Sequence, residues 1–207
     1  MAATKLIILR GNSGSGKSTV AAGLRAAYGR GIAVVGQDVV RRQILRERDV
    51  ADAVNVGLLG LMARHILDQG IHVVLEGILY AEHYGQMLAQ LRRDHAGATF
   101  AYYFDIPYEA TVERHRTKPN RDDFTPQDMR GWYRAGDVLG GGWERTIVAD
   151  SSLDETVERI LAESGLLAAA RPPGPGFADA VVRAERKSGE ILRPGVENDG
   201  AAPSQGH

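Results

Sequence analysis

A glycine-rich run near the N-terminus contains the residues whose types and spacing point to the most specific chemistry. Positions 11–18 read Gly-Asn-Ser-Gly-Ser-Gly-Lys-Ser and fit the pattern G-x-x-x-x-G-K-[ST] at every fixed position. Glycines let successive backbone N–H groups converge on phosphate oxygens at a helix N-terminus, Lys17 reaches the β- and γ-phosphates, and the Ser18 hydroxyl ligates Mg²⁺. The dinucleotide fingerprint G-x-G-x-x-G does not fit these glycines. The sequence therefore predicts a P-loop for ATP and Mg²⁺, formed by Gly11, Asn12, Ser13, Gly14, Ser15, Gly16, Lys17, Ser18 and Thr19.

Two carboxylates follow apolar runs that read as strands. Asp38 comes just after the run at 32–36, and Glu76 ends the run at 71–75. In an open parallel sheet, residues beyond the carboxyl ends of the strands line the ligand crevice. Asp38 could accept the proton of a substrate hydroxyl, or it could cap the helix that begins at Val39. Glu76 could serve a Mg²⁺-bound water or a substrate hydroxyl, or it could pair with a structural arginine.

Basic residues form two candidate groups. One lies at 114–121 and contains Arg114, His115, Arg116, Lys118 and Arg121. Arginines that close over the equatorial phosphate oxygens stabilise phosphoryl transfer, so Arg114 and Arg121 are catalytic candidates; a solvated helix C-terminus is the alternative. In the other group Arg42, next to Arg41, could hold an anionic acceptor or belong to a solvated helix face.

The elements that must position these residues alternate between strand and helix periodicity. The strand-like segments are 4–10, 32–36, 71–75, 99–104 and 145–148. The helix-like segments are 17–27, 39–47, 54–67, 82–93, 109–116 and 153–163, with one more announced by Thr125-Pro126. Strands that alternate with helices pair in parallel through right-handed crossovers, which predicts a three-layer α/β sandwich. In the 54–67 helix we expect Leu58, Leu61, Met62 and Ile66 to face the core, and we expect Trp132 and Tyr133 to be core residues.

The composition changes after Ala170 and divides the chain. The run Arg-Pro-Pro-Gly-Pro-Gly at 171–176 cannot continue a helix and is typical of a linker. We therefore predict a P-loop domain at 1–170, followed by a Pro/Gly-rich linker and a poorly ordered tail at 171–207.

The overall composition excludes several classes. There is no cysteine, so thiolate catalysis, disulfides and Cys-bound zinc are ruled out. With 25 basic and 26 acidic residues the formal net charge is −1, which argues against nucleic acid and anionic membranes as partners. No apolar run approaches the length of a membrane span, so the expected location is the cytoplasm. A GTPase would also carry an Asn/Thr-Lys-x-Asp motif; the nearest match, Thr-Lys-Pro-Asn at 117–120, lacks the aspartate.

From residue 4 to about residue 165 the sequence resembles the small P-loop kinases that include zeta toxins and chloramphenicol phosphotransferases. The resemblance is carried by the spacing from Lys17 to Asp38, the pair Glu76-Gly77, Arg114, and Arg121 before a Thr-Pro helix start. It implies a five-stranded parallel sheet in the order 2-3-1-4-5 with helices on both faces. It also implies that Asp38 is the base, that Glu76 helps place the acceptor, and that Arg114 and Arg121 bracket the triphosphate. The segment between these two arginines is shorter than in zeta toxins.

These observations predict an ATP- and Mg²⁺-dependent phosphotransferase that acts on the hydroxyl of a small molecule. In this reading Asp38, Arg42 and Glu76 bind the acceptor. A nucleoside or nucleotide kinase is one alternative. The other is a nucleotide-binding regulatory module that hydrolyses ATP slowly and shows no acceptor-dependent release of ADP.

Overall fold

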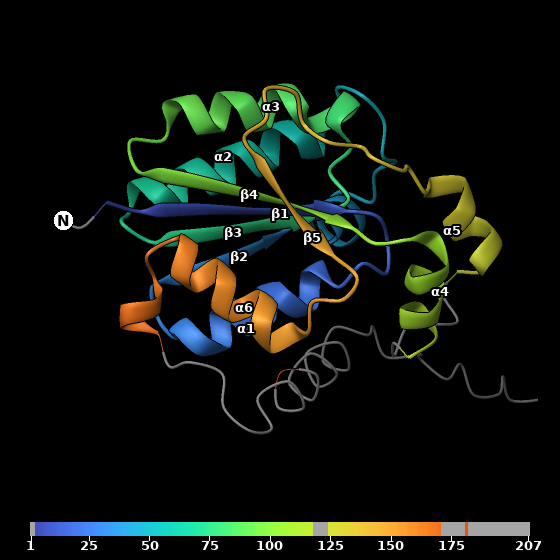
Figure 1. Cartoon of the computed structure of the whole chain (residues 1–207). Helices are drawn as coiled ribbons and strands as arrows, with labels where there is room; N and C mark the ends of the chain where they lie inside the picture. Colours follow the sequence, from blue (N-terminus) through green and yellow to red (C-terminus); the bar gives the residue numbers. More distant parts are fainter. Residues whose placement is uncertain (1–2, 118–123, 171–180, 182–207) are drawn as a thin grey trace, which may run out of the picture.

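A parallel β-sheet forms the centre of the protein in a computed structural model that describes residues 3–117, 124–170 and 181 (Figure 1). Its five strands are β1 (Lys5–Gly11), β2 (Ile32–Gly36), β3 (His72–Gly77), β4 (Ala98–Asp105) and β5 (Glu144–Val148). They are hydrogen-bonded in the order β2-β3-β1-β4-β5, and every pair is parallel. The predicted fold class and strand order are therefore confirmed.

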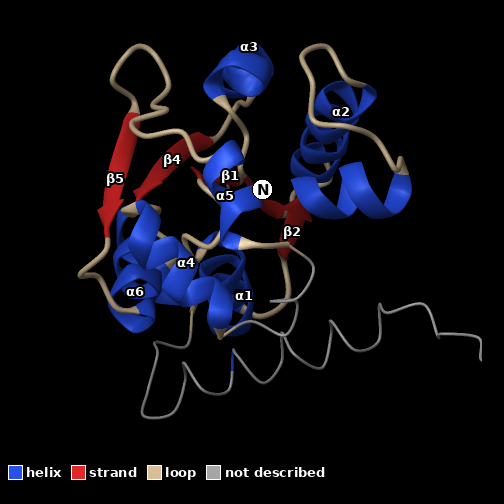
Figure 2. Ribbon diagram, turned by 90° about the vertical axis from the view of Figure 1, so that its right-hand side faces the viewer, coloured by secondary structure: helices blue, strands red, loops and turns tan. Residues whose placement is uncertain are grey.

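Helices cover both faces of this sheet. The helices α1 (Lys17–Tyr28) and α6 (Leu153–Glu163) pack on one face, and α2 (Val54–Asp68) and α3 (Ala81–Asp94) pack on the other. Figure 2 views the carboxyl edge of the sheet, beyond which lie α4 (Tyr108–Arg116) and α5 (Pro126–Trp132). This edge is where the loops that carry the candidate site residues meet.

The central strand β1 explains why the apolar runs in the sequence are continuous. Ile7 and Leu9 pack into the core beneath α1 and α6, whereas Leu6 and Ile8 pack into the core beneath α2 and α3. All four side chains are fully buried. A strand that is covered on both faces has no solvent side, so its pattern is an apolar run rather than an alternation.

The N-terminal ends of two helices carry the capping residues that the sequence indicates. Thr125 and Asp128 form a reciprocal capping box at the start of α5, with Pro126 at the first helical position. Ser152 and Glu155 form the same motif at the start of α6. Each box satisfies backbone N–H groups that the helix leaves without internal partners.

The helix expected at 39–47 is shorter than predicted. It is a π-helix, η1, over Val39–Ile44, and Arg46 follows with a positive φ of 51°. The Glu47 carboxylate turns to the next helix and accepts hydrogen bonds from the backbone N–H groups of Val54 (2.7 Å) and Asn55 (2.9 Å). The first turn of α2 therefore uses Glu47 as its acceptor, which ends the preceding helix early.

Two expectations about burial are correct only in part. Of the four residues expected to face the core from α2, Leu58, Met62 and Ile66 are partly buried and pack against it, whereas Leu61 is 66% exposed. The fully buried positions of this helix are Asn55, Leu59, Ala63 and Leu67. The apolar residues of this helix cover most of its circumference, so periodicity alone does not select the buried stripe. Trp132 is exposed and lies at the end of α5 rather than in the core, whereas Tyr133 is half-buried.

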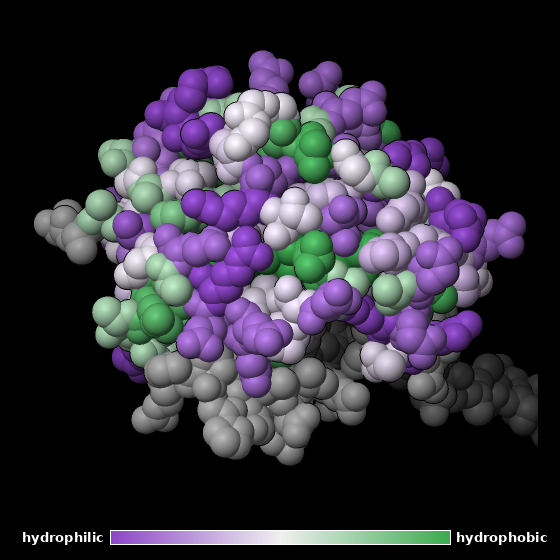
Figure 3. Space-filling model, viewed as in Figure 1, coloured by the Kyte–Doolittle hydropathy of each residue, from purple (hydrophilic) through white to green (hydrophobic). Residues whose placement is uncertain are grey.

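The surface over β5 and α6 is mainly hydrophilic, and its apolar side chains form small separate groups (Figure 3). Arg145 and Thr146 lie exposed on the edge strand β5, where a charge opposes pairing with another chain. Among the described residues, no helix combines the length and apolar character needed to cross a bilayer.

The predicted tail falls almost entirely outside the described residues. Val181 is the exception, and its side chain is buried. We predict that truncation after Ala170 leaves ATP affinity unchanged, because the P-loop and the strand ends all lie before that residue. Burial of one valine stabilises by about 1.5 kcal/mol, so the Tm measured by calorimetry should fall by no more than about 6 °C. A larger fall would contradict the division at residue 170.

Candidate active site

The P-loop connects β1 to α1 at the carboxyl edge. Its glycines are required by the backbone, because Gly14 and Gly16 have φ values of +79° and +101°. A Cβ at Gly14 would also lie 2.5 Å from the carbonyl oxygen of Thr111. The side chain of Lys17 bends back over the loop, and its Nζ donates to Asn12 O (2.8 Å) and Ser15 Oγ (3.1 Å). The loop therefore holds the lysine ammonium above backbone N–H groups suited to a phosphate chain.

Ser18 and Glu76 meet beside the P-loop. The Ser18 hydroxyl donates to Glu76 Oε2 at 3.1 Å, and Glu76 pairs in register with Leu9, shortly before the loop. Gly77 is needed after the glutamate because a Cβ there would lie 2.5 Å from the Gln37 Cβ. A hydroxyl and a carboxylate at this separation are oxygen donors of the kind that Mg²⁺ prefers, so this pair could hold the cation of a bound nucleotide.

Asp38 lies at the end of β2, and its side chain is 60% exposed. The Asp38 Oδ1 pairs with Arg41 (3.0 Å) and Arg42 (3.3 Å). It stands at the N-cap position of η1 but makes no capping hydrogen bond, so the structure offers no support for a capping role. Gly36, the last residue of β2, is close to Glu76, because a Cβ at Gly36 would lie 3.1 Å from Glu76 Oε1. The end of β2, two residues before Asp38, is therefore adjacent to Glu76 on β3.

Arg114 is a second cation beside the P-loop, on the β4–β5 side of β1. It projects from α4, and its guanidinium donates to Ser15 O (3.0 Å) and to Ala149 O (3.0 Å) after β5. A cation fixed to the P-loop backbone can stabilise charge that develops on a transferring phosphoryl group. Arg121 lies outside the described residues.

A buried polar network holds the backbone around Asp38 in place. Gln37 Nε2 donates to Tyr84 OH (2.9 Å), which donates to Asp49 Oδ1 (2.8 Å). Burial raises the pKa of Tyr84 well above its usual range, so this phenol stays protonated and can act as a donor. The network ties the end of β2 and the segment after η1 to α3, which keeps the backbone around Asp38 in place.

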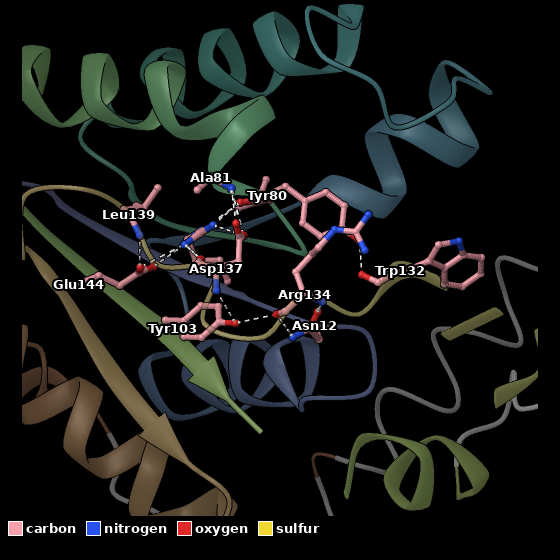
Figure 4. A network of polar contacts seen from close by, with 11 residues as sticks. Asn12, Tyr80, Ala81, Tyr103, Trp132, Arg134, Asp137, Leu139 and Glu144 are labelled. Atoms are coloured by element: carbon pink, nitrogen blue, oxygen red, sulfur yellow. Dashed lines mark hydrogen bonds and ion pairs between the residues drawn. The ribbon is translucent and has the colours of Figure 1, made fainter. Parts of the chain in front are cut away.

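A second network, which the sequence does not reveal, lies behind the P-loop (Figure 4). Arg10, the last residue before the loop, is completely buried. Its guanidinium pairs with Asp137 (2.8 Å) and Glu144 (3.1 Å) and donates to Leu79 O. Asp137 in turn accepts from the backbone N–H of Ala81 at the start of α3 (3.0 Å). The only signal in the sequence is an arginine at the end of an apolar strand, a position that requires charged partners.

Removal of the Arg10 charge should destabilise the fold. In Arg10→Met the carboxylate of Glu144, which is 3% exposed, loses its partner, and a broken buried ion pair costs about 3–5 kcal/mol. Urea denaturation should show this loss, and Arg10→Met/Glu144→Gln should recover part of it. The control Arg25→Met lies on the exposed surface of α1 and should change the free energy of unfolding by less than about 0.5 kcal/mol. Equal stability of Arg10→Met and the control would contradict this account.

Comparison with known proteins places the chain in a family. Residues 6–134 match the family described as an AAA domain, AAA_33. The chain belongs to the AAA_33 family. The matched range of this AAA_33 protein contains the P-loop, Asp38, Glu76 and Arg114. No curated protein matches its sequence.

Solved kinase structures share the fold of this AAA_33 protein. APS kinase from Mycobacterium tuberculosis, in complex with AMPPNP and APS, has a TM-score of 0.58 at 20% identity and covers 77% of this chain and 96% of its own. A sugar kinase from Janibacter sp. HTCC2649 has a TM-score of 0.58 at 17% identity, with 81% and 98% covered. A gluconokinase from Sinorhizobium meliloti has a TM-score of 0.50 at 16% identity, with 90% and 97% covered. The predicted likeness to the small P-loop kinases is therefore confirmed for the fold.

Proposed function

We propose that this AAA_33 protein transfers the γ-phosphoryl group of ATP, with Mg²⁺, to a hydroxyl of a small molecule. The observation that carries the proposal is the exposed carboxylate of Asp38 just beyond β2, because the last residue of β2 pairs with Glu76, which accepts a hydrogen bond from Ser18 of the P-loop. A P-loop alone supports nucleotide binding. A solvent-accessible carboxylate at the same sheet edge as the P-loop, oriented by Arg41 and Arg42, supports transfer to an acceptor.

The chain's own residues supply the steps of transfer. Asp38 accepts the proton of the acceptor hydroxyl as its oxygen forms a bond to the γ-phosphorus, and the bond from that phosphorus to the β–γ bridging oxygen breaks. Lys17 and Arg114 stabilise the charge that spreads over the phosphoryl oxygens. Ser18 and Glu76 would hold Mg²⁺, which neutralises charge on the β- and γ-phosphates.

A panel of hydroxylated acceptors tests the proposal. The purified protein is incubated with ATP and Mg²⁺ and, in separate reactions, with sugars, sugar acids, nucleosides and aminoglycoside-like compounds. ADP release that depends on one acceptor, together with a phosphate ester of that acceptor in the mass spectrum, would support it. Turnover of nucleosides alone would favour a nucleoside kinase. ADP release at one slow rate with every compound would favour a regulatory module and contradict the proposal.

Glu76→Gln separates a metal role from an acceptor role. If Glu76 helps to hold Mg²⁺ through Ser18, the concentration of Mg²⁺ that gives half-maximal rate should rise about 10-fold or more. The affinity for the acceptor should stay close to that of wild type. A change confined to the KM of the acceptor would contradict the metal role and assign Glu76 to the acceptor.

A further inference from the structure

The segment between α5 and β5 crosses the carboxyl edge directly against the P-loop. The Asn12 side chain clamps it: Asn12 Nδ2 donates to Arg134 O (2.8 Å), and the backbone N–H of Arg134 donates to Asn12 Oδ1 (2.8 Å). Tyr103 OH also donates to Arg134 O (3.2 Å). Asn12 is the same residue whose carbonyl oxygen accepts from Lys17 Nζ. The backbone of Arg134 is therefore fixed to the P-loop residue that also holds Lys17, and Figure 4 shows Arg134 beside Asn12.

The guanidinium of Arg134 has no carboxylate partner among the described residues. The hydrogen bonds that it makes within this part of the chain go to two backbone oxygens, those of Gly131 (3.1 Å) and Tyr133 (3.2 Å). The guanidinium carbon lies 5.6 Å from the centre of the Tyr80 ring, and the residue is exposed. An arginine whose backbone is clamped and whose charge is uncompensated offers free donors to an anion.

Tyr80 is itself held in place. Its hydroxyl donates to Trp132 O, and the next residue, Ala81, donates its N–H to Asp137 in the buried network. Burial raises the pKa of Tyr80; the guanidinium groups of Arg134 and Arg41 lower this pKa, and the carboxylates of Asp49 and Asp137 raise it. Arg41 pairs with Asp38, so the Arg41 guanidinium lies next to the proposed base.

The strand order indicates on which side of the P-loop Asp38 and Tyr80 lie. Asp38 follows β2, and Tyr80 follows β3, so both lie on the β2–β3 side of the P-loop strand β1. Arg114 and its partner Ala149 follow β4 and β5, on the opposite side. An anion between Arg134 and Arg41 would therefore lie beside Asp38.

We propose that Arg134, stacked on Tyr80 and assisted by Arg41, binds an anionic group of the acceptor, such as a carboxylate, phosphate or sulfate. The subsite rests on the proposed phosphotransferase function and narrows its substrate class to anionic hydroxy compounds. A bidentate guanidinium–oxyanion contact at this point fixes the acceptor at a second position. The acceptor hydroxyl is then presented to Asp38 in a defined orientation.

Sulfate binding tests the subsite without an identified acceptor. The protein is saturated with AMPPNP and Mg²⁺, so that the P-loop is filled, and sulfate is titrated by calorimetry. Wild type should bind sulfate saturably, and Arg134→Ala should weaken the affinity about 10-fold or more, with Arg134→Lys between the two. Arg159→Ala on α6, an arginine paired with Glu163, is the control. Absence of sulfate binding, or equal affinity in Arg134→Ala, would overturn the proposal.

An activity arm separates this subsite from the function on which it rests. Sugar acids and sugar phosphates are compared with the parent sugars, and Arg134→Ala should raise the KM of anionic acceptors about 10-fold or more while the Kd of AMPPNP stays unchanged. Efficient transfer to neutral acceptors, with Arg134 dispensable, would overturn the subsite and leave the phosphotransferase intact. Sulfate binding that depends on Arg134, without phosphate transfer to any acceptor, would support the subsite and count against the phosphotransferase.

Discussion

Lys17→Ala should reduce turnover by about 10³-fold or more, the range expected when a preorganised charge is removed from a phosphoryl-transfer site. The lysine ammonium lies over the P-loop, where it is bonded to Asn12 and Ser15. Alanine cannot replace that charge. The loop should keep its shape, because the positive φ angles of Gly14 and Gly16 determine it.

Three measurements separate this loss from unfolding. Steady-state rates report turnover, circular dichroism reports the fold, and calorimetry with AMPPNP reports nucleotide affinity. Lys5→Ala is the matched control, since Lys5 lies at the amino end of the same strand, β1, away from the P-loop. If Lys17→Ala retained more than about a tenth of wild-type activity, the loss would be too small for an electrostatic contact of this kind. That result would contradict the role of Lys17 in phosphoryl transfer.

Asp38→Asn should lower kcat by about 10² to 10⁴, the usual range for a positioned proton acceptor. Asparagine keeps the shape of the side chain but removes the negative charge that now pairs with Arg41 and Arg42. A loose transition state needs less help from a base, so the expected value lies toward the lower end of this range. ATP binding in the presence of Mg²⁺ should be nearly normal.

Asp52→Asn provides the control for this substitution. Asp52 is exposed in the segment before α2 and has a positive φ of 58°, a conformation that asparagine tolerates. It should leave kcat and the free energy of unfolding close to wild type. Near-wild-type kcat in Asp38→Asn would remove Asp38 from the catalytic step. Loss of ATP binding instead would place Asp38 among the groups that hold the metal.

The fold was predictable because its signals are local. Four of the five strands are apolar runs that are covered by helices on both faces, and two helices begin with capping boxes that can be read from residues three apart. The π-helix η1 was not predictable, because its end depends on the backbone of Arg46 and on Glu47 acting as the acceptor for α2. The buried face of α2 was predicted only in part, with Leu61 wrongly placed in it, because the apolar residues surround most of the helix.

The residues of the candidate site also divide into those that a local sequence pattern predicts and those that it does not. The P-loop is one contiguous segment, and Asp38 and Glu76 each follow a strand, so the rule for strand ends finds them. Arg10, Asn12 and Arg134 act through contacts between residues more than 100 positions apart along the chain. No pattern within a single segment records such pairs, and the uncompensated charge of Arg134 is visible only once its surroundings are known.

The destination of the γ-phosphate tests the central claim most directly. ATP labelled in its γ-phosphate is incubated with the protein, Mg²⁺ and an accepted hydroxyl compound, and the products are separated after a single turnover. Transfer from the P-loop to a hydroxyl beside Asp38 predicts that the label appears in a phosphate ester of the acceptor, and that Asp38→Asn slows its appearance. Label found only in inorganic phosphate, at a rate that no acceptor changes, would contradict the phosphotransferase account.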